Sequence, residues 1–169
     1  SLRGTPPISR LLNLEDGEKV VGLVPLDEDG PIWWAATSGG TIKRIRPEVL
    51  STQDSYSVIG LDDADQVVAA GFGGDDGTFI LISSAAQLLR TPADKVRPQG
   101  RLGQGICGMK LGDDDRVISA ALISADALES SLVVTVAGIA TSTPGSGQTS
   151  AKVTALLQYP QKGRAGQGV

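Results

Sequence analysis

Positively charged side chains recur in this sequence just after short apolar runs, and they are its best candidates for ligand binding. The chain has no histidine and a single cysteine, Cys107. Histidine-based acid–base catalysis and histidine or cysteine zinc sites are therefore excluded. Lysine and arginine bind phosphate oxygens through charge-assisted hydrogen bonds. We therefore expect phosphate binding from these side chains and assign no catalytic or metal-binding residue.

The candidate phosphate contacts fall in three groups along the chain. They are Lys43, Arg44 and Arg46; Arg90, Lys95, Arg97, Arg101 and Gln104; and Lys152, Lys162, Arg164 and Gln167. Acidic residues gather at expected turns and strand starts, and the formal net charge is −4, which taken alone argues against nucleic acid. Charges are screened beyond about 8–10 Å at physiological salt. A phosphate near a basic cluster would therefore respond mainly to the local cations.

The basic groups belong to a pattern that repeats three times. Each copy begins with an acidic residue, a polar residue and two aliphatic residues, at 18–21, 65–68 and 115–118. Each start is followed by a second apolar run, at 33–37, 79–83 and 132–136. A period near 40 to 50 residues with short apolar runs between glycine- and proline-rich turns predicts propeller-like units of strands.

Two further features of the copies carry the candidate residues. The stretch 38–44 matches 84–90 at a shift of 46 residues, and both end in a basic strand. The sequence Gly-Arg-x-Gly-Gln-Gly occurs at 100–105 and again, shifted by 63 residues, at 163–168. Backbone N–H groups of glycine approach phosphate closely, so these loops could add donors. In the third copy the turn is expanded at 138–147, which predicts a mobile surface loop.

The pattern predicts an all-β fold made of four-stranded units. The repeats are expected at 18–64, 65–114 and 115–169, with 1–17 as the tail of a preceding unit. One unit cannot bury both its faces, so about three to four units should pack side by side as one domain or partial disk. The chain begins with serine, which suggests a piece of a longer protein, and no apolar run is long enough to span a bilayer.

Several of these residues also have a purely structural interpretation. Trp33 and Trp34 lie in an apolar run and are expected in the core, not stacked on bases. Cys107 is expected to be a small buried hydrophobic residue. The aspartates at 113–115 lack the spacing of a calcium loop and predict a solvated turn.

The basic residues have such an alternative too. Lys43, Arg44 and Arg90 could be solvated edge-strand residues that prevent sheets from pairing between molecules. Arg101 and Arg164 could simply cap their glycine-rich turns. For all five residues, the sequence leaves both roles open: a contact to DNA phosphate and a purely structural role.

The repeat, the basic strand with Lys43 or Arg90, and the loop that begins at Gln99 resemble a known family. It is the C-terminal β-pinwheel of the A subunit of bacterial type IIA topoisomerases, DNA gyrase and topoisomerase IV. The stretches 1–10 and 95–101 are similar to actinobacterial members.

The gyrase loop of that family reads Gln-Arg-Arg-Gly-Gly-Lys-Gly. In the second copy Gln99, Arg101, Gly103 and Gly105 match it, whereas Gly100, Leu102 and Gln104 depart from it; in the last copy Arg164, Gly166 and Gly168 match. The first copy has 55–58 in place of the loop. These departures favour a protein similar to topoisomerase IV over full gyrase-type wrapping.

The resemblance implies a disk whose basic edge bends or wraps duplex DNA for the ATP-dependent strand passage that controls supercoiling. It implies no cofactor in this fragment, since ATP and Mg²⁺ act through other domains or subunits. The implied partners are double-stranded DNA and, for a parent gyrase A homodimer, the separate ATPase subunit, in the cytoplasm at the nucleoid and not at a membrane. The alternative is a propeller-like protein–protein interaction module without DNA binding.

Overall fold

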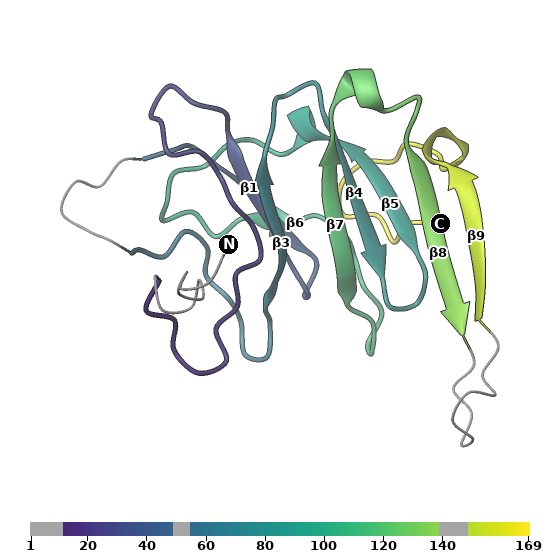
Figure 1. Cartoon of the computed structure of the whole chain (residues 1–169), viewed down its shortest axis with the longest axis horizontal. Coiled ribbons are helices and arrows are strands. Elements are labelled where there is room, and N and C mark those ends of the chain that lie inside the picture. Colours follow the sequence, from purple (N-terminus) through teal and green to yellow (C-terminus); the bar gives the residue numbers. More distant parts are fainter. Residues whose placement is uncertain (1–11, 49–54, 139–148) are drawn as a thin grey trace, which may run out of the picture.

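The computed structural model of the chain describes residues 12–48, 55–138 and 149–169 and is built from short β-strands (Figure 1). The strands are β1 (Trp33–Thr37), β2 (Thr41–Ile45), β3 (Val67–Phe72), β4 (Thr78–Ser83), β5 (Leu88–Pro92), β6 (Ile106–Cys107), β7 (Val117–Ile123), β8 (Leu132–Gly138) and β9 (Thr149–Ala155). Three single 3-10 turns accompany them: η1 (Ala93–Lys95), η2 (Ala125–Ala127) and η3 (Leu156–Gln158). No helix among these described elements is long enough to cross a membrane. The prediction of an all-β fold is confirmed.

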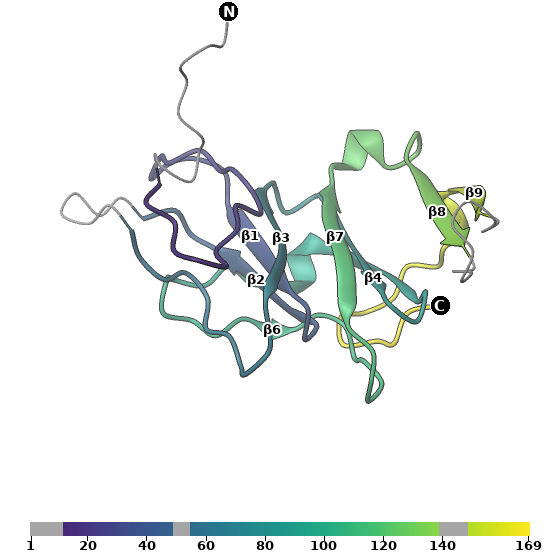
Figure 2. The same ribbon diagram turned by 60° about the horizontal axis from the view of Figure 1, so that its bottom comes forward.

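The described strands form three antiparallel sheets that follow one another along the molecule (Figures 1 and 2). Their strand orders are β3-β1-β2-β6, β5-β4-β7 and β8-β9. Alternation of side chains along each strand gives every sheet two faces, and facing sheets bury apolar side chains between them. The sheets therefore contain four, three and two strands, where the sequence predicts units of four.

Each of the first two sheets takes a strand from the next copy of the repeat. β3 begins the second copy, yet it pairs with β1 of the first, with Trp33 opposite Phe72. β7 begins the third copy and pairs with β4 of the second, with Thr78 opposite Ile123. Both pairings contain a bulge at the same place, just before the turn of the hairpin. The sheets are thus linked by exchange of strands as well as by contact of their faces.

The largest core cluster lies between the first and second sheets. Trp34 and Phe79 pack edge to face, with ring centroids 5.6 Å apart, and Leu81, Leu89 and Met109 are among the other members of the cluster. Full burial of a side chain of this size stabilises a fold by about 2–3 kcal/mol. Trp33 lies on the opposite face of β1 in a separate cluster, and its indole N–H donates to the carbonyl of Pro25 (2.7 Å). The prediction that both tryptophans belong to the core is confirmed.

An aspartate at the start of each exchanged strand fastens that strand to the neighbouring hairpin. Asp65 accepts hydrogen bonds from the Ser38 hydroxyl (2.6 Å) and the Gly39 N–H (2.7 Å). Asp115 accepts the equivalent bonds from the Ser84 hydroxyl (2.7 Å) and the Ala85 N–H (2.9 Å). Partial burial raises the pKa of Asp65, but the hydrogen bonds outweigh it and the net shift is downward.

We expect the Asp115 contacts to make stability depend on pH. Hydrogen bonds from the hydroxyls of Ser83 and Ser84 lower the pKa of Asp115 from 3.8 to about 2. The contribution is therefore complete above pH 3.8 and is lost as the pH falls toward 2. Asp115→Asn should lower the melting temperature at pH 7 and flatten its fall between pH 4 and 2. Asp114→Asn, in the same exposed turn, is the control; equal pH profiles for both variants would contradict the assignment.

Two of these expectations differ from the structure, and a third falls on residues that the structure does not describe. Residues 18–21 form no strand, whereas the other two starts do. Each of those pairs with the hairpin of the copy before it, and the described residues contain no hairpin that precedes 18–21. Cys107 is exposed because it lies on the short edge strand β6. The expected mobile loop at 138–147 falls almost entirely outside the described residues.

Candidate nucleic-acid interface

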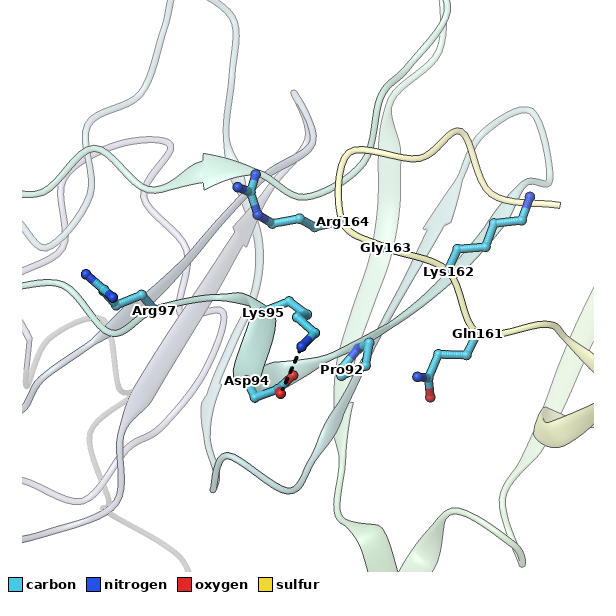
Figure 3. Close-up of a pocket in the computed structure, with 8 residues that line it drawn as sticks. All are labelled: Pro92, Asp94, Lys95, Arg97, Gln161, Lys162, Gly163 and Arg164. Atoms are coloured by element: carbon cyan, nitrogen blue, oxygen red, sulfur yellow. Dashed lines mark hydrogen bonds and ion pairs between the residues drawn. The ribbon is translucent and has the colours of Figure 1, made fainter.

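A groove of about 820 Å³ brings together basic residues from two distant loops (Figure 3). Lys95 and Arg97 come from η1 and the residues after it, and Lys162 and Arg164 come from the chain after η3. Asp94 is the one carboxylate among the lining residues, and it pairs with Lys95 at 3.3 Å. Lys95, Arg97, Lys162 and Arg164 are all accessible at the surface. We call this set of four the basic groove.

The two loops meet because both are anchored to strand β5. Arg90 of β5 forms a parallel bridge with Gln161, and its carbonyl accepts the N–H of Lys162 (2.8 Å). At the end of the same strand, the N–H of Ala93 donates to the carbonyl of Gly77 (2.9 Å) and begins η1. Backbone hydrogen bonds therefore anchor both loops at the buried strand β5, and this anchoring fixes the backbone that carries the four cations.

Lys162 has a structural contact in addition to its exposed position. Its Nζ donates to the carbonyl of Gly168 (2.7 Å) and closes the glycine-rich loop on itself. In Figure 3 its side chain extends away from the Asp94–Lys95 pair, while Arg97 and Arg164 reach out on the opposite side of the view. Lys162 still lines the groove, but its ammonium group is engaged by the Gly168 carbonyl. The side chains of Arg97 and Arg164 are less restrained.

Two of the expected DNA contacts lie in the interior. Lys43 and Arg44 are both only 1% exposed, so their side chains are not on the surface of this structure. Lys43 Nζ donates to the carbonyls of Val58 and Arg101. Burial, together with the nearby charge of Arg101, lowers the pKa of Lys43. The sequence pattern placed these residues correctly on a strand but did not show that both faces of that strand are covered.

Arg44 connects the first sheet to the second. Its Nη1 donates to the carbonyls of Ala93 and Val96, each at 3.3 Å, and its Nη2 pairs with Asp75. Ala93 and Val96 bound η1, so this buried arginine supports the turn that carries Lys95. Arg44 therefore contributes to the groove by fixing the backbone of η1 and not by contacting a ligand.

The remaining candidates lie outside the lining of the basic groove. Arg46, Gln104, Lys152 and Gln167 are accessible at the surface, whereas Arg90 and Arg101 are half-buried. Arg101 lies 3.8 Å from Glu48 and 6.0 Å from the centre of the Tyr56 ring, which restrains its side chain. Arg90 has two buried nitrogens, Nε and Nη1, without a partner among the described residues.

The glycine-rich loops have a packing role that the sequence did not reveal. Ile106 pairs with Ile42 on β2, and Val169 forms the equivalent backbone bonds with Leu88 on β5 (3.0 Å each way). Gly105 and Gly168 precede these residues with φ of +79° and +84°, a region that favours glycine. The N–H of Gly105 donates to the side chain of Gln99 (3.0 Å), which closes the second-copy loop as Lys162 closes the last one.

Gly105→Ala should destabilise the fold by about 2–3 kcal/mol. A Cβ there would lie 2.8 Å from Thr41 Cγ2 and 3.1 Å from the carbonyl oxygen of Ile42, at a strained φ. Gly100→Ala is the matched control, since a Cβ at Gly100 meets nothing within 4 Å. Urea unfolding of the two variants measures the difference. Equal stability would contradict the packing role.

Sequence reasoning missed two members of this region. Gln161 lines the groove and bridges to Arg90, but neither its type nor its spacing distinguishes it, because proline occupies the equivalent place, Pro98. Asp94 is a second omission, since a single carboxylate beside Lys95 carries no pattern of its own. Among the described residues no group of three metal-ligating side chains gathers, in the groove or elsewhere.

The chain is similar to known proteins over nearly its whole length. The family described as DNA gyrase C-terminal domain, beta-propeller, matches residues 9–27, 78–124 and 150–169. The DNA gyrase A subunit of Salmonella typhimurium is 33% identical over 167 residues, which cover 96% of this chain and 18% of that relative. The DNA gyrase A subunit of Mycobacterium leprae is 29% identical over 168 residues, with 96% and 12% covered. These identities favour no one bacterial group, and an actinobacterial origin is not resolved.

Two solved structures share the fold. The C-terminal domain of DNA topoisomerase IV matches with a TM-score of 0.74 at 20% identity, over 96% of this chain and 48% of that one. The DNA gyrase A C-terminal domain matches with a TM-score of 0.69 at 25% identity, over 98% and 52%. The chain thus spans about half of these domains. Sheet architecture and sequence agree, and the chain belongs to the family of C-terminal β-pinwheel domains found in the A subunit of DNA gyrase and its topoisomerase IV counterpart.

Proposed function

We propose that this chain binds duplex DNA through phosphate contacts along the basic groove and bends or wraps it. The observation that carries the proposal is the gathering of Lys95, Arg97, Lys162 and Arg164, which lie 65 or more residues apart in two pairs, beside a single carboxylate. Asp94 is already paired with Lys95. No long helix is available among the described elements to read base edges, so the contacts are independent of sequence.

The outlying candidates extend the proposed DNA path. Arg46, Gln104, Lys152 and Gln167 are accessible and can reach a phosphate without rearrangement, and the half-buried Arg90 and Arg101 can contribute at its margin. Lys43 and Arg44 act through the fold by holding carbonyls of the loops around them. This assignment narrows the twelve candidate residues to ten that can touch DNA.

The domain would act within a longer protein. As part of a gyrase A homodimer working with the separate ATPase subunit, in the bacterial cytoplasm, it would guide a duplex segment for strand passage, while ATP and Mg²⁺ are used elsewhere. The domain itself supplies binding and geometry and performs no chemistry. The loop departures at Gly100, Leu102 and Gln104 favour DNA guidance of the topoisomerase IV kind over complete wrapping.

Salt dependence tests the proposal directly. Random-sequence duplex should bind the 169-residue chain more weakly as the salt concentration rises. A plot of log affinity against log salt concentration should have a slope of about −3 to −4, because each neutralised phosphate contributes about −0.9. Fluorescence anisotropy at a series of salt concentrations measures the slope. No binding even at low salt would contradict the proposal and favour the alternative, a protein–protein interaction module, for which the net charge of −4 is equally natural.

A further inference from the structure

Leu102 is an exposed apolar residue at the tip of the second-copy loop, residues 100–105. It is 78% exposed, a fraction that only Leu23 matches among the large apolar residues that the structure describes. Leu102 is the third residue of a tight turn, in which the N–H of Gly103 donates to the carbonyl of Gly100 (3.1 Å). Single exposed leucines are common, so the loop that holds Leu102 and the residues beside it decide its role.

The backbone around Leu102 is held by side chains of the fold. Buried Lys43 donates from its Nζ to the carbonyl of Arg101 (2.7 Å), the residue before Leu102. On the other side of the turn, the N–H of Gly105 donates to the side chain of Gln99 (3.0 Å). The loop that presents Leu102 is therefore fixed before any ligand binds, which lowers the cost of ordering this side chain in a complex.

The second-copy loop stands on the first sheet in the way that the last loop stands on the second sheet. The N–H of Gln99 donates to the carbonyl of Arg44 on β2 (2.8 Å). The N–H of Lys162 donates to the carbonyl of Arg90 on β5, also at 2.8 Å. These bonds join equivalent residues of the repeat, so the two loops are related by one unit. Since Arg164 of the last loop lines the basic groove, we expect the second-copy loop on the path of the same duplex.

Arg97 connects the basic groove to the second-copy loop. It lines the groove and lies two residues before Gln99, which anchors that loop. Figure 3 shows Arg97 and Lys162 on opposite sides of the residues drawn. A duplex that follows the cations from Lys162 past Arg97 therefore reaches Arg101 and Leu102 next.

The residues beside Leu102 fit a nucleic acid better than a protein surface. In the stretch 97–105, Leu102 is the only apolar side chain apart from Pro98. Protein interfaces bury contiguous apolar patches, whereas many DNA-bending proteins insert single apolar side chains, leucine among them, between base pairs from the minor groove. Arg101 and Gln104, on either side of Leu102, are of the types that accompany such an insertion.

We propose that Leu102 inserts between two base pairs of a duplex bound along the basic groove and kinks the duplex at that step. This inference rests on the proposed DNA binding and adds the residue that bends the bound duplex. Pyrimidine–purine steps such as TA unstack and kink most easily, whereas A-tracts are stiff. The chain therefore favours a duplex with a TA step through the cost of deformation, without reading base edges.

A duplex with a single TA step tests the insertion. The fluorescent base 2-aminopurine, in place of the adenine of that step, emits more strongly when its neighbours unstack. Its emission should rise when the native chain binds at low salt and should stay at the level of the free duplex with Leu102→Ala. Leu102→Met should keep the rise, because methionine also inserts between base pairs. Leu23→Ala, at a leucine of equal exposure outside the groove lining, should behave like the native chain.

Affinity measurements separate insertion from phosphate binding. Leu102→Ala removes no cation, so the slope of log affinity against log salt concentration should match that of the native chain. The native chain should prefer the TA duplex to an A-tract duplex by about 10-fold, and Leu102→Ala should reduce this preference to less than about 2-fold.

Four results would overturn the insertion. Three of them leave the proposed DNA binding intact: binding by the native chain without a rise in emission, a rise that Leu102→Ala retains, and a rise that Leu23→Ala loses as well. The fourth, no binding of either duplex by the native chain at low salt, would overturn the proposed function together with the insertion.

Discussion

Reversing three charges of the basic groove should reduce DNA affinity by about 1,000-fold or more. The variant is Arg97→Glu, Lys162→Glu and Arg164→Glu, which leaves the Asp94–Lys95 pair intact. Each charge-assisted hydrogen bond contributes about 1.5 kcal/mol or more, and the new carboxylates repel phosphate. Fluorescence anisotropy at low salt measures the loss. The slope of log affinity against log salt should become shallower by about 3, since three phosphate contacts are lost.

The matched control carries the same change in net charge elsewhere. Lys19→Glu, Lys110→Glu and Arg116→Glu also convert three surface cations, none of which lines the groove. Each variant therefore starts from −4 and gains six negative charges, two at each of its three positions. If they lose affinity equally, the overall charge governs binding and the basic groove has no special role.

Arg44→Met should destabilise the protein by about 3 kcal/mol, and it changes none of the residues that line the groove. Methionine replaces most of the buried volume, but the carbonyl of Val96 loses the Arg44 donor, the carbonyl of Ala93 keeps only the N–H of Val96, and the Asp75 carboxylate loses its partner. An unpaired buried polar group is costly. For a chain of this size the melting temperature should fall by about 6–12 °C. Differential scanning calorimetry measures the shift.

Arg46→Met is the control for this variant, two residues along but exposed. Its melting temperature should change by less than about 2 °C, because isolated surface substitutions have small effects. An equal drop in both variants would contradict the supporting role of Arg44. DNA affinity gives a second comparison: a direct phosphate contact predicts that the folded Arg44→Met protein binds weakly, whereas the buried position predicts little change.

The sequence predicted the strands better than it predicted their surroundings. The apolar runs at 79–83 and 132–136 became β4 and β8 because short runs between turns have few alternatives. Lys43 and Arg44 were expected outside because charged residues are seldom buried unless paired. What buries them is contact with carbonyls of residues 52 to 58 positions away, such as Val96 and Arg101, and no local pattern encodes such contacts.

In the candidate site, too, the sequence predicted what depends on residue type and repetition but not what depends on tertiary contacts. Lys95, Arg97, Lys162 and Arg164 were identified from residue type and repetition, and the structure brings these four together. Gln161 was missed because its position depends on a bridge to Arg90, which is a tertiary contact. The glycines at 105 and 168 were recognised as a motif, but their left-handed backbone and close approach to strands emerged only in three dimensions.

The borrowing of strands between neighbouring copies has a consequence for biosynthesis. β4 and β5 are complete once residue 92 has left the ribosome, yet their sheet lacks its third member until β7, which ends at Ile123, emerges. A translating ribosome would therefore always carry one half-finished sheet with an open edge, the kind of surface that invites aggregation. Each newly made copy completes its predecessor, so maturation advances along the nascent chain one unit behind synthesis.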